Sequence, residues 1–551
     1  MQSNHQETTT LERKRRLSES VLWKLQRNYF DCQGIEAWST AAVPHHITCS
    51  PFIAQAYARI VLAFLRDYHS VKTGKEDPGL LPFDPGRPLY IVELGSGSGR
   101  FAYLFLKQFL AHHSVLRDIP IKFVMTDFAE RTIESWRAHS WFQPFVENGV
   151  LDFARFDVER DRKLKLVYSG ETISAKTLKH PIVVIANYLF DSIPQDAFFV
   201  SGGELFETLV TATTPQKETD PNDPEILSRV ELSYDYNRVN GHYYDNAKWN
   251  RILADYKKRL PDTGFLFPNA ALRCLENLRR LSRGRMLLLS GDRGYSSDEA
   301  LLEGQGAPTM AVHGSFSMMV DYQIIGEYCR QLGGEALHPA HSVKSLNISA
   351  FIFGHTASNF SETRQAYTEA IEKFGPDDFF TLKEGMSEIY EALTVDQILA
   401  FLRLSCWDYR RFCDCLPALK KRLPDMTALQ KQQLHEAIVK VWDSYLPIGE
   451  EGDLAFDLGT ILLEMEFNAE ALEFLQRSVD LYSIAPGTAY NIAVCYYGLG
   501  QTDQALDYVN MALGLDPEFA EAKAMRSTFI HNGKHVDKAP KLTDFTLQLE
   551  Q

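Results

Sequence analysis

The sequence predicts an α/β protein with a parallel sheet, preceded by a helical segment and followed by an all-α domain. Short runs that are apolar throughout alternate with helical stretches between residues 86 and 360. This pattern is typical of parallel strands that are buried on both faces of a sheet. Strand signals vanish after about residue 361, and a 34-residue periodicity follows. We therefore expect an N-terminal helical segment, an α/β domain, a helical connector and a repeat domain over 1–85, 86–360, 361–450 and 451–535.

The N-terminal segment is predicted to be helical. Residues 51–65 carry apolar side chains at helical spacing, and Ser50 stands where the first turn needs a cap. The basic run from Arg13 to Arg16 is interpreted as the solvated start of a helix, with a targeting or binding signal as the alternative.

The α/β domain is predicted to contain strands over 88–94, 121–126, 151–156, 182–186 and 286–289. Residues 211–245 are polar and include the stretch TTPQKETDPNDPE. We expect this segment to be an insertion or mobile loop over the edge of the sheet.

The C-terminal repeat domain is predicted from residues that recur 34 positions apart. The paired positions hold small or apolar side chains: Gly459 and Ala493, Ala471 and Ala505, Leu475 and Val509, Ser478 and Ala512. This period, with Pro517 after the second helix, is typical of tetratricopeptide repeats. Residues 518–531 are expected to form a capping helix. The connector over 361–450 is expected to be helical, with degenerate helical pairs as an alternative.

Composition narrows the classes of partner. The formal net charge of −15 argues against duplex nucleic acid, which binds to basic surfaces. No apolar run approaches the roughly 20 residues that a bilayer-spanning helix needs, and the first residues show no secretion signal, so we expect a cytoplasmic protein without a membrane partner. The eight cysteines are scattered, and Cys413 and Cys415 are too close for a zinc knuckle, so no metal site is predicted.

The stretch IVELGSGSGR, residues 91–100, predicts a ligand-binding turn between a strand and a helix. Gly95, Gly97 and Gly99 leave backbone N–H groups uncovered by side chains. Three interpretations compete: a tight turn alone, a dinucleotide site, or a site for S-adenosylmethionine. The dinucleotide fingerprint G-x-G-x-x-G places its third glycine one residue later. An acid before the first glycine, here Glu93, is typical of methyltransferase loops, where it helps to hold the loop and the cationic methionine end of the cofactor.

Acids at the ends of the next strands favour S-adenosylmethionine. Asp127 ends the second predicted strand, where its carboxylate can accept both vicinal hydroxyl protons of a ribose. Asp157 follows the third strand and is placed to accept from an adenine amino group. With Glu93 and the three glycines, these residues form the predicted cofactor site, and S-adenosylmethionine is the predicted cofactor.

Residues 184–194, VIANYLFDSIP, resemble the MidA-type S-adenosylmethionine-dependent methyltransferases, whose strand ends in Asn-Glu-Phe-Phe-Asp-Ala-Leu-Pro. The matching positions are Asn187, Phe190, Asp191 and Pro194. Residues 287–295 and 313–321 resemble two later family motifs, and the similarity extends over about 30–355. The resemblance implies a Rossmann-like class I methyltransferase domain and adds Asn187 to the predicted cofactor-binding residues. Mitochondrial members of the family are protein arginine methyltransferases that assist respiratory complex I assembly.

The sequence departs from the family at two positions. Tyr188 replaces the Glu after the strand-end Asn, and the family's Asp-Tyr-Gly becomes GDRGY over 291–295. Guanidinium recognition uses carboxylates that accept from its N–H groups, so the loss of that Glu weakens the inference of arginine specificity.

The predicted function is methyl transfer to a nitrogen of a protein, arginine among the candidates, with the substrate recruited by the repeats. The predicted catalytic residues are Asn187, Tyr188 and Asp191, with Asp292 and His313 in second place. A cofactor-binding assembly or scaffold protein without catalysis is one alternative, and a small-molecule methyltransferase is another. The repeats are alternatively an intramolecular brace or a homodimer contact.

Overall fold

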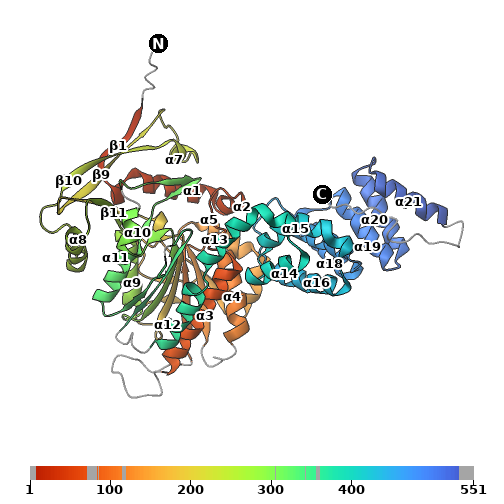
Figure 1. The fold of residues 1–551 in the computed structure, drawn as a ribbon, viewed down its shortest axis with the longest axis horizontal. Coiled ribbons are helices and arrows are strands. Elements are labelled where there is room, and N and C mark those ends of the chain that lie inside the picture. The colour runs from red at the N-terminus through yellow and green to blue at the C-terminus, as the bar shows by residue number, and fades with distance from the viewer. Residues whose placement is uncertain are drawn as a thin grey trace, which may run out of the picture. The chain divides into compact units, whose positions relative to one another are not determined.

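The computed structural model describes residues 8–70, 84, 86–113, 120–303, 306–341, 343–354 and 360–532 (Figure 1). The chain forms two compact units, Met1–Glu384 and Gly385–Gln551, and each is considered by itself. In the described part of the chain, no helix has both the length and the apolar character needed to cross a bilayer.

The core of the first unit is a seven-stranded sheet. Its strands, from edge to edge, are β17 (Glu335–Leu337), β18 (Asn347–Phe353), β12 (Met286–Asp292), β7 (Ile182–Asn187), β2 (Leu89–Leu94), β3 (Ile121–Asp127) and β4 (Leu151–Arg155). The run from β12 to β4 is parallel, and β18 is antiparallel to β12. Each strand predicted from an apolar run is present and confirms the expected parallel sheet.

The order of the strands reverses beside β2. The chain passes from β2 outward to β3 and β4, then returns to the other side of β2 as β7. In register, Glu93 lies opposite Ile185 and Leu94 opposite Ala186. At such a switch point the connections leave in opposite directions, so the carboxyl ends of β2 and β7 border a crevice where ligands bind in open α/β sheets.

Helices cover both faces of this sheet (Figure 1). On one face lie α3 (Pro51–Ser70), α4 (Arg100–His113) and α12 (Ser361–Tyr367), and Phe105 of α4 contacts Phe123 of β3 with ring centroids 5.4 Å apart. On the other face, α8 (Ala247–Arg259), α9 (Asn269–Leu281) and α11 (Tyr322–Gln331) share a buried cluster with the central strands. Burial on both faces explains the uniformly apolar strands.

A second, antiparallel sheet corrects two predictions. It contains β1 (Thr9–Arg16), β8 (Asp196–Ser201), β9 (Glu204–Thr214), β10 (Glu231–Arg238) and β11 (Thr263–Phe267). The basic run is therefore the end of a strand and not a helix start, so the segment 1–85 is not wholly helical. Likewise, much of 211–245 is not a loop: β9 pairs with β10 around the short helix α7 (Ile226–Arg229).

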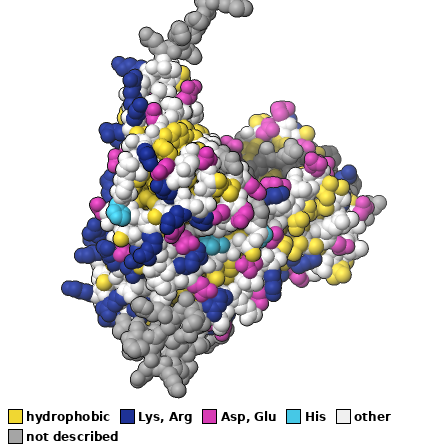
Figure 2. Space-filling model, turned by 60° about the vertical axis from the view of Figure 1, so that its left-hand side comes forward, with side chains coloured by type: hydrophobic (Ala, Val, Ile, Leu, Met, Phe, Trp, Pro, Cys, Tyr) yellow, Lys and Arg dark blue, Asp and Glu magenta, His cyan; other side chains and the backbone are white. Residues whose placement is uncertain are grey.

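Tertiary contacts explain the strand at the N-terminus. β1 pairs with β9, and Arg16 donates two hydrogen bonds to buried Asp196, at 2.8 and 2.6 Å. Arg13, Lys14 and Arg15 remain exposed, and Lys14 lies 3.1 Å from Asp235 of β10. Figure 2 shows lysine and arginine side chains along this sheet, at the top of that view.

The second unit is helical in its described part. It contains α14 (Val395–Leu404), α15 (Tyr409–Arg422), α16 (Ala428–Asp443), α17 (Leu454–Glu464), α18 (Asn468–Tyr482), α19 (Pro486–Gly498), α20 (Thr502–Leu515) and α21 (Ala520–Asn532). The helices α17 and α18 pack as one pair and α19 and α20 as the next. Gly459 has no room for a side chain, since a Cβ there would lie 2.9 Å from Leu475 Cγ. This close approach is what the 34-residue pattern predicts.

The first unit extends beyond the expected domain boundary at residue 360. Buried Asp67 on α3 accepts hydrogen bonds from the backbone N–H groups of Glu362 and Thr363, at 3.2 and 2.7 Å, and from the Thr363 hydroxyl at 2.7 Å. Asp377 similarly accepts from the backbone N–H of Ser345 at 2.7 Å. Residues 361–384 therefore complete the first unit. The last three residues of the predicted 451–535 domain lie outside the described residues.

We expect Asp67→Ala to lower the free energy of unfolding of the first unit by about 1–3 kcal/mol, because it leaves buried N–H groups of α12 without an acceptor. Urea unfolding of the full chain, followed by near-ultraviolet circular dichroism, measures the change. The neighbouring Arg66→Ala is the control: it removes an exposed ion pair with Glu362 and should cost less than about 1 kcal/mol. Equal effects of the two substitutions would contradict the assigned role of Asp67.

Candidate cofactor and acceptor site

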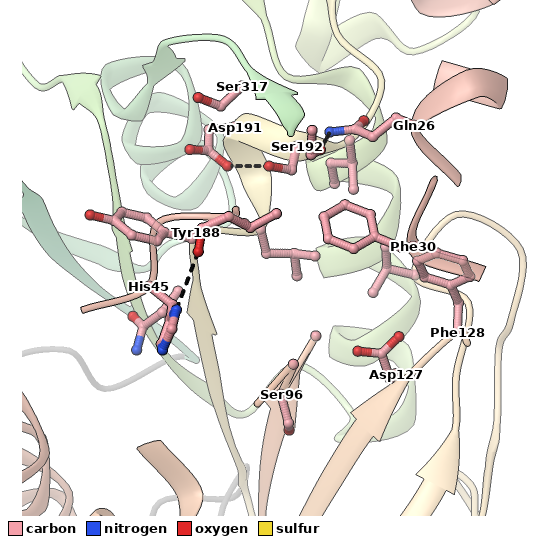
Figure 3. Close-up of a pocket in the computed structure, with 18 of the residues that line it drawn as sticks. Gln26, Phe30, His45, Ser96, Asp127, Phe128, Tyr188, Asp191, Ser192 and Ser317 are labelled. Carbon is pink, nitrogen blue, oxygen red and sulfur yellow. Dashed lines mark hydrogen bonds between the residues drawn. The ribbon is translucent and has the colours of Figure 1, made fainter. Parts of the chain in front are cut away.

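A cavity of about 310 Å³ lies at the carboxyl ends of β2, β3 and β7 (Figure 3). It is lined by most of the residues predicted from the sequence to bind cofactor or to act in catalysis: Glu93, Gly95, Gly97, Asp127, Asp157, Asn187, Tyr188 and Asp191. His313 also lines it. Gly99 and Asp292 lie outside the lining.

The three glycines of the loop differ in what their backbone atoms contact. All have positive φ angles, +63° at Gly95, +49° at Gly97 and +76° at Gly99, which side chains rarely tolerate. Gly95 and Gly97 face the cavity, and a Cβ at Gly97 would lie 2.9 Å from Trp38 Cζ2. Gly99 instead packs inward, where a Cβ would lie 2.9 Å from both Met125 and Phe142. The third glycine therefore serves the turn and its packing.

Glu93 and Asn187 carry buried polar atoms that find no partner among the described residues. These atoms are Oε2 of Glu93, an acceptor, and Nδ2 of Asn187, a donor. The Tyr57 hydroxyl donates to Oδ1 of Asn187 at 2.8 Å, which leaves Nδ2 available. A buried polar group without a hydrogen-bond partner is costly in free energy. An unpartnered acceptor and an unpartnered donor in one cavity therefore indicate that a ligand binds there. The ammonium and carboxylate of an amino-acid group match this acceptor and donor.

Burial controls the protonation of the acids in the cavity. It raises the pKa of Glu93 to about 8, helped by the negative charge of Asp127 and opposed by a hydrogen bond from Ser96. Burial also raises the pKa of Asp127 to about 6, although backbone N–H groups, that of Ala129 at 3.0 Å included, stabilise its charge. Glu93 therefore binds a proton at neutral pH and releases it when a cation enters.

Asp127 lies at the end of the cavity that has aromatic walls. Figure 3 shows its carboxylate near Phe30 and Phe128, across the cavity from Tyr188 and Asp191. Phe30 stacks on Trp38 with centroids 5.6 Å apart. A carboxylate beside flat apolar side chains suits a nucleoside, whose ribose donates hydrogen bonds and whose base stacks.

Asp157 also lines the cavity, but its carboxylate already forms an ion pair. Its Oδ2 lies 2.7 Å from Arg27 Nη2, and its Oδ1 accepts from the backbone N–H of Glu159 at 3.0 Å. Arg27 also pairs with Glu159 at 3.1 Å and lies over the Phe128 ring. The structure thus places Asp157 at the cavity as predicted, with an ion-pair partner that sequence reasoning did not foresee.

An acidic pair closes the other end. Asp191 accepts from Ser192 Oγ at 2.7 Å, while Asp292, behind it, accepts from Tyr322 at 2.8 Å and Ser290 at 3.3 Å. Burial raises the pKa of Asp191 to about 6, against hydrogen bonds from Ser192 and with Asp292. Burial and then the charge of Asp191 raise the pKa of Asp292 well above its usual value. The pair therefore shares a proton and acts as one negative charge.

Tyr188 lies beside this acidic pair. It has φ +50°, a strained conformation for a bulky residue, and its backbone N–H donates to the Gly291 carbonyl at 2.9 Å. Burial, followed by the charges of Asp191 and Asp292, raises the pKa of its hydroxyl above the usual value. The hydroxyl therefore keeps its proton and is a hydrogen-bond donor.

Much of the remaining wall comes from N-terminal residues that sequence reasoning missed: Trp23, Gln26, Arg27, Phe30, Trp38, Val43, Pro44, His45, Thr48 and Cys49. Most lie on or after α1 (Val21–Gln33) and α2 (Glu36–Ser39). Gln26 links this wall to the hairpin of β14 (Ala311–His313) and β15 (Ser315–Ser317), since its Nε2 donates to the Phe316 carbonyl at 2.6 Å. The cluster of aromatics in residues 23–38 was the available signal.

Part of the chain matches a family of known proteins. Residues 80–318 match a family model described as "Putative S-adenosyl-L-methionine-dependent methyltransferase". The matched segment contains the glycine loop, both strand-end acids and the acidic pair. The match supports a methyltransferase-type domain over these residues, with S-adenosylmethionine as its cofactor. Among curated proteins, none matches the chain.

Solved structures show weaker likeness. A protein from Burkholderia thailandensis bound to S-adenosyl-homocysteine is 13% identical, with a TM-score of 0.37, over 61% of this chain and 87% of its own. An uncharacterised protein of the same superfamily and organism is 13% identical, with a TM-score of 0.36, over 60% and 86%. YrrB, a tetratricopeptide protein with a peptide-binding site, is 22% identical, with a TM-score of 0.23, over 33% and 88%. Scores this low support no statement about activity.

The residues present fit S-adenosylmethionine. Glu93 and Asn187 would hold the amino-acid group, and Asp127 the ribose hydroxyls, with Phe30 and Phe128 beside the base. In the described part of the chain, no group of three or more His, Cys, Asp or Glu is arranged to hold a metal ion.

We expect S-adenosyl-homocysteine to displace about one proton when it binds at pH 7, because its ammonium lowers the pKa of Glu93 from about 8. Calorimetry in two buffers of different ionisation enthalpy measures the release. Glu93→Gln should abolish it and weaken binding about tenfold or more. The exposed Glu231→Gln is the control. Release that persists in Glu93→Gln would show that another group pairs with the ammonium.

Proposed function

We propose that the chain methylates a nitrogen atom of a protein substrate, using S-adenosylmethionine, and that the C-terminal helical pairs recruit this substrate. The observation that carries the proposal is the buried carboxylate of Asp191, which lies with Tyr188 across the cavity from Asp127 and interacts with the buried carboxylate of Asp292. A buried negative charge attracts a cationic or proton-bearing nitrogen.

Positioning accounts for most of the proposed catalysis. Bound S-adenosylmethionine supplies an electrophilic methyl group on its sulfonium. Glu93 and Asn187 would hold the amino-acid end of the cofactor and Asp127 its ribose, which would restrict the motion of the methyl donor relative to the acceptor. The apolar side chains of Phe30 and Trp38 exclude water from the cavity.

Asp191 and Tyr188 would handle the acceptor. The Asp191 carboxylate has a pKa of about 6 and is ionised near neutral pH, so it can orient a nitrogen-bound hydrogen and accept a proton. Tyr188 lines the cavity, and its hydroxyl keeps a proton that it can donate. Since Tyr188 stands where the resembled family has Glu, the site supports nitrogen methylation in general, and arginine is one candidate acceptor.

The helical second unit supports substrate recruitment. Stacked helix pairs at a 34-residue spacing commonly present a concave surface to peptides or helices. The cytoplasmic location, a homodimer and the absence of nucleic-acid and membrane partners stay predictions.

We expect Asp191→Asn to reduce methyl transfer to protein at least about 100-fold, because the amide neither attracts a cation nor accepts its proton. The readout is label incorporated from tritiated S-adenosylmethionine into a lysate of cells that lack the protein. S-adenosyl-homocysteine affinity should change less than about threefold. The exposed Asp255→Asn on α8 is the matched control.

Two results would contradict the proposal. One is a wild-type chain that binds S-adenosyl-homocysteine but labels no protein. The other is an Asp191→Asn variant that labels its target at the wild-type rate.

A further inference from the structure

Arg293 is a cation at the cavity whose guanidinium makes no hydrogen bond or ion pair with the described residues. Among the residues that the structure describes, Arg27 and Arg293 are the arginines that line the cavity, and no lysine lines it. Arg27 is committed to Asp157 and Glu159 at 2.7 and 3.1 Å. For the Arg293 guanidinium, by contrast, the described part of the chain provides neither a hydrogen bond nor an ion pair. The site thus offers one uncommitted positive charge.

The backbone holds Arg293 at a fixed point of the rim. The residue directly follows Asp292, the last residue of β12, and its carbonyl accepts from the backbone N–H of Val320 at 2.9 Å. The next residue, Gly294, lies so close to β16 (Val320–Asp321) that a Cβ would be 2.4 Å from the Val320 carbonyl oxygen. The exposed side chain of Arg293 therefore starts from a rigid position, as a specificity residue requires.

The charge of Arg293 acts on the acceptor end of the cavity. It lowers the pKa of Asp191, against the dominant effect of burial, and it adds to burial in lowering the pKa of His313. It also moderates the raised pKa of Tyr188. All three of these residues line the cavity, so Arg293 belongs with the acceptor-binding groups.

The acceptor end consequently carries both signs of charge. Asp191 and Asp292 share a proton and contribute one negative charge, and Arg293 contributes one positive charge beside them. An acceptor with positive charge alone is attracted by the acids and repelled by Arg293. An acceptor whose nitrogen is adjacent to a carboxylate satisfies both, since guanidinium binds carboxylate through two parallel hydrogen bonds.

We propose that Arg293 is the specificity-determining residue of the acceptor site and binds the carboxylate of an acidic residue next to the methylated nitrogen. The inference rests on the proposed function for the nature of the acceptor. Its substrate class is a protein segment in which a nitrogen-bearing side chain is flanked by Asp or Glu.

Binding tests this proposal without methyl transfer. The probes are a short acetylated and amidated peptide with Glu on both sides of a central Arg, and its counterpart with Gln in place of Glu. Calorimetry with the full chain saturated with S-adenosyl-homocysteine should show at least about tenfold tighter binding of the Glu peptide. Arg293→Met should remove this preference and Arg293→Lys should restore part of it. The exposed Arg251→Met is the matched control and should leave the preference intact.

Three results would overturn the assignment. The first is equal affinity of the wild-type chain for the two peptides, absence of binding included, and the second is a preference that survives in Arg293→Met. The third is a loss of S-adenosyl-homocysteine affinity in Arg293→Met, which would assign the guanidinium to the cofactor. The same peptides incubated with tritiated S-adenosylmethionine separate the two proposals. A preference that depends on Arg293, without label in either peptide or in a lysate, supports the acceptor assignment and contradicts the proposed function.

Discussion

The buried carboxylate of Glu93 is the constraint on which the site depends. Glu93 is the last residue but one of the central strand β2, between β3 and β7, where sheet hydrogen bonds fix its backbone and no described cation neutralises it. A carboxylate in that position is costly in either protonation state unless a ligand supplies positive charge. The positive φ angles of the following glycines let the chain turn away at once, so the carboxyl group faces a cavity instead of a packed helix.

Acids at neighbouring strand ends divide the cavity into regions with different chemistry. Asp127 is stabilised as an anion by backbone N–H groups, whereas Asp191 and Asp292 destabilise each other's charge. Asp157 differs again because Arg27 neutralises it. An acid at a strand end can therefore accept hydrogen bonds from hydroxyl groups, share a proton with a second acid, or form an ion pair. Which of these it does depends on the groups within hydrogen-bond distance.

The sequence predicted the parts of this site that depend on local chemistry. Apolar runs located the parallel strands, and the carboxyl ends of parallel strands share one edge, so Asp127 was identified from its position at a strand end. Glu93 was identified from its place before the glycine loop, and Asn187 from the resemblance to a methyltransferase family. The N-terminal wall was not predicted, because Trp38 reaches Gly97 only through tertiary packing. Arg16 likewise joins a strand because Asp196, far along the chain, accepts its hydrogen bonds. Propensity cannot anticipate either contact.

The position of β1 has a consequence for how this protein can be handled. β1 is an edge strand, and only the short turn Leu17–Glu19 separates it from α1, which supplies a wall of the cavity. The register in which β1 pairs with β9 therefore determines the position of α1 and of its aromatic side chains at the cavity. A tag, a cleavage or a foreign strand that displaces those few residues would disturb this wall of the cavity from a distance, while leaving the glycine loop and the strand-end acids untouched.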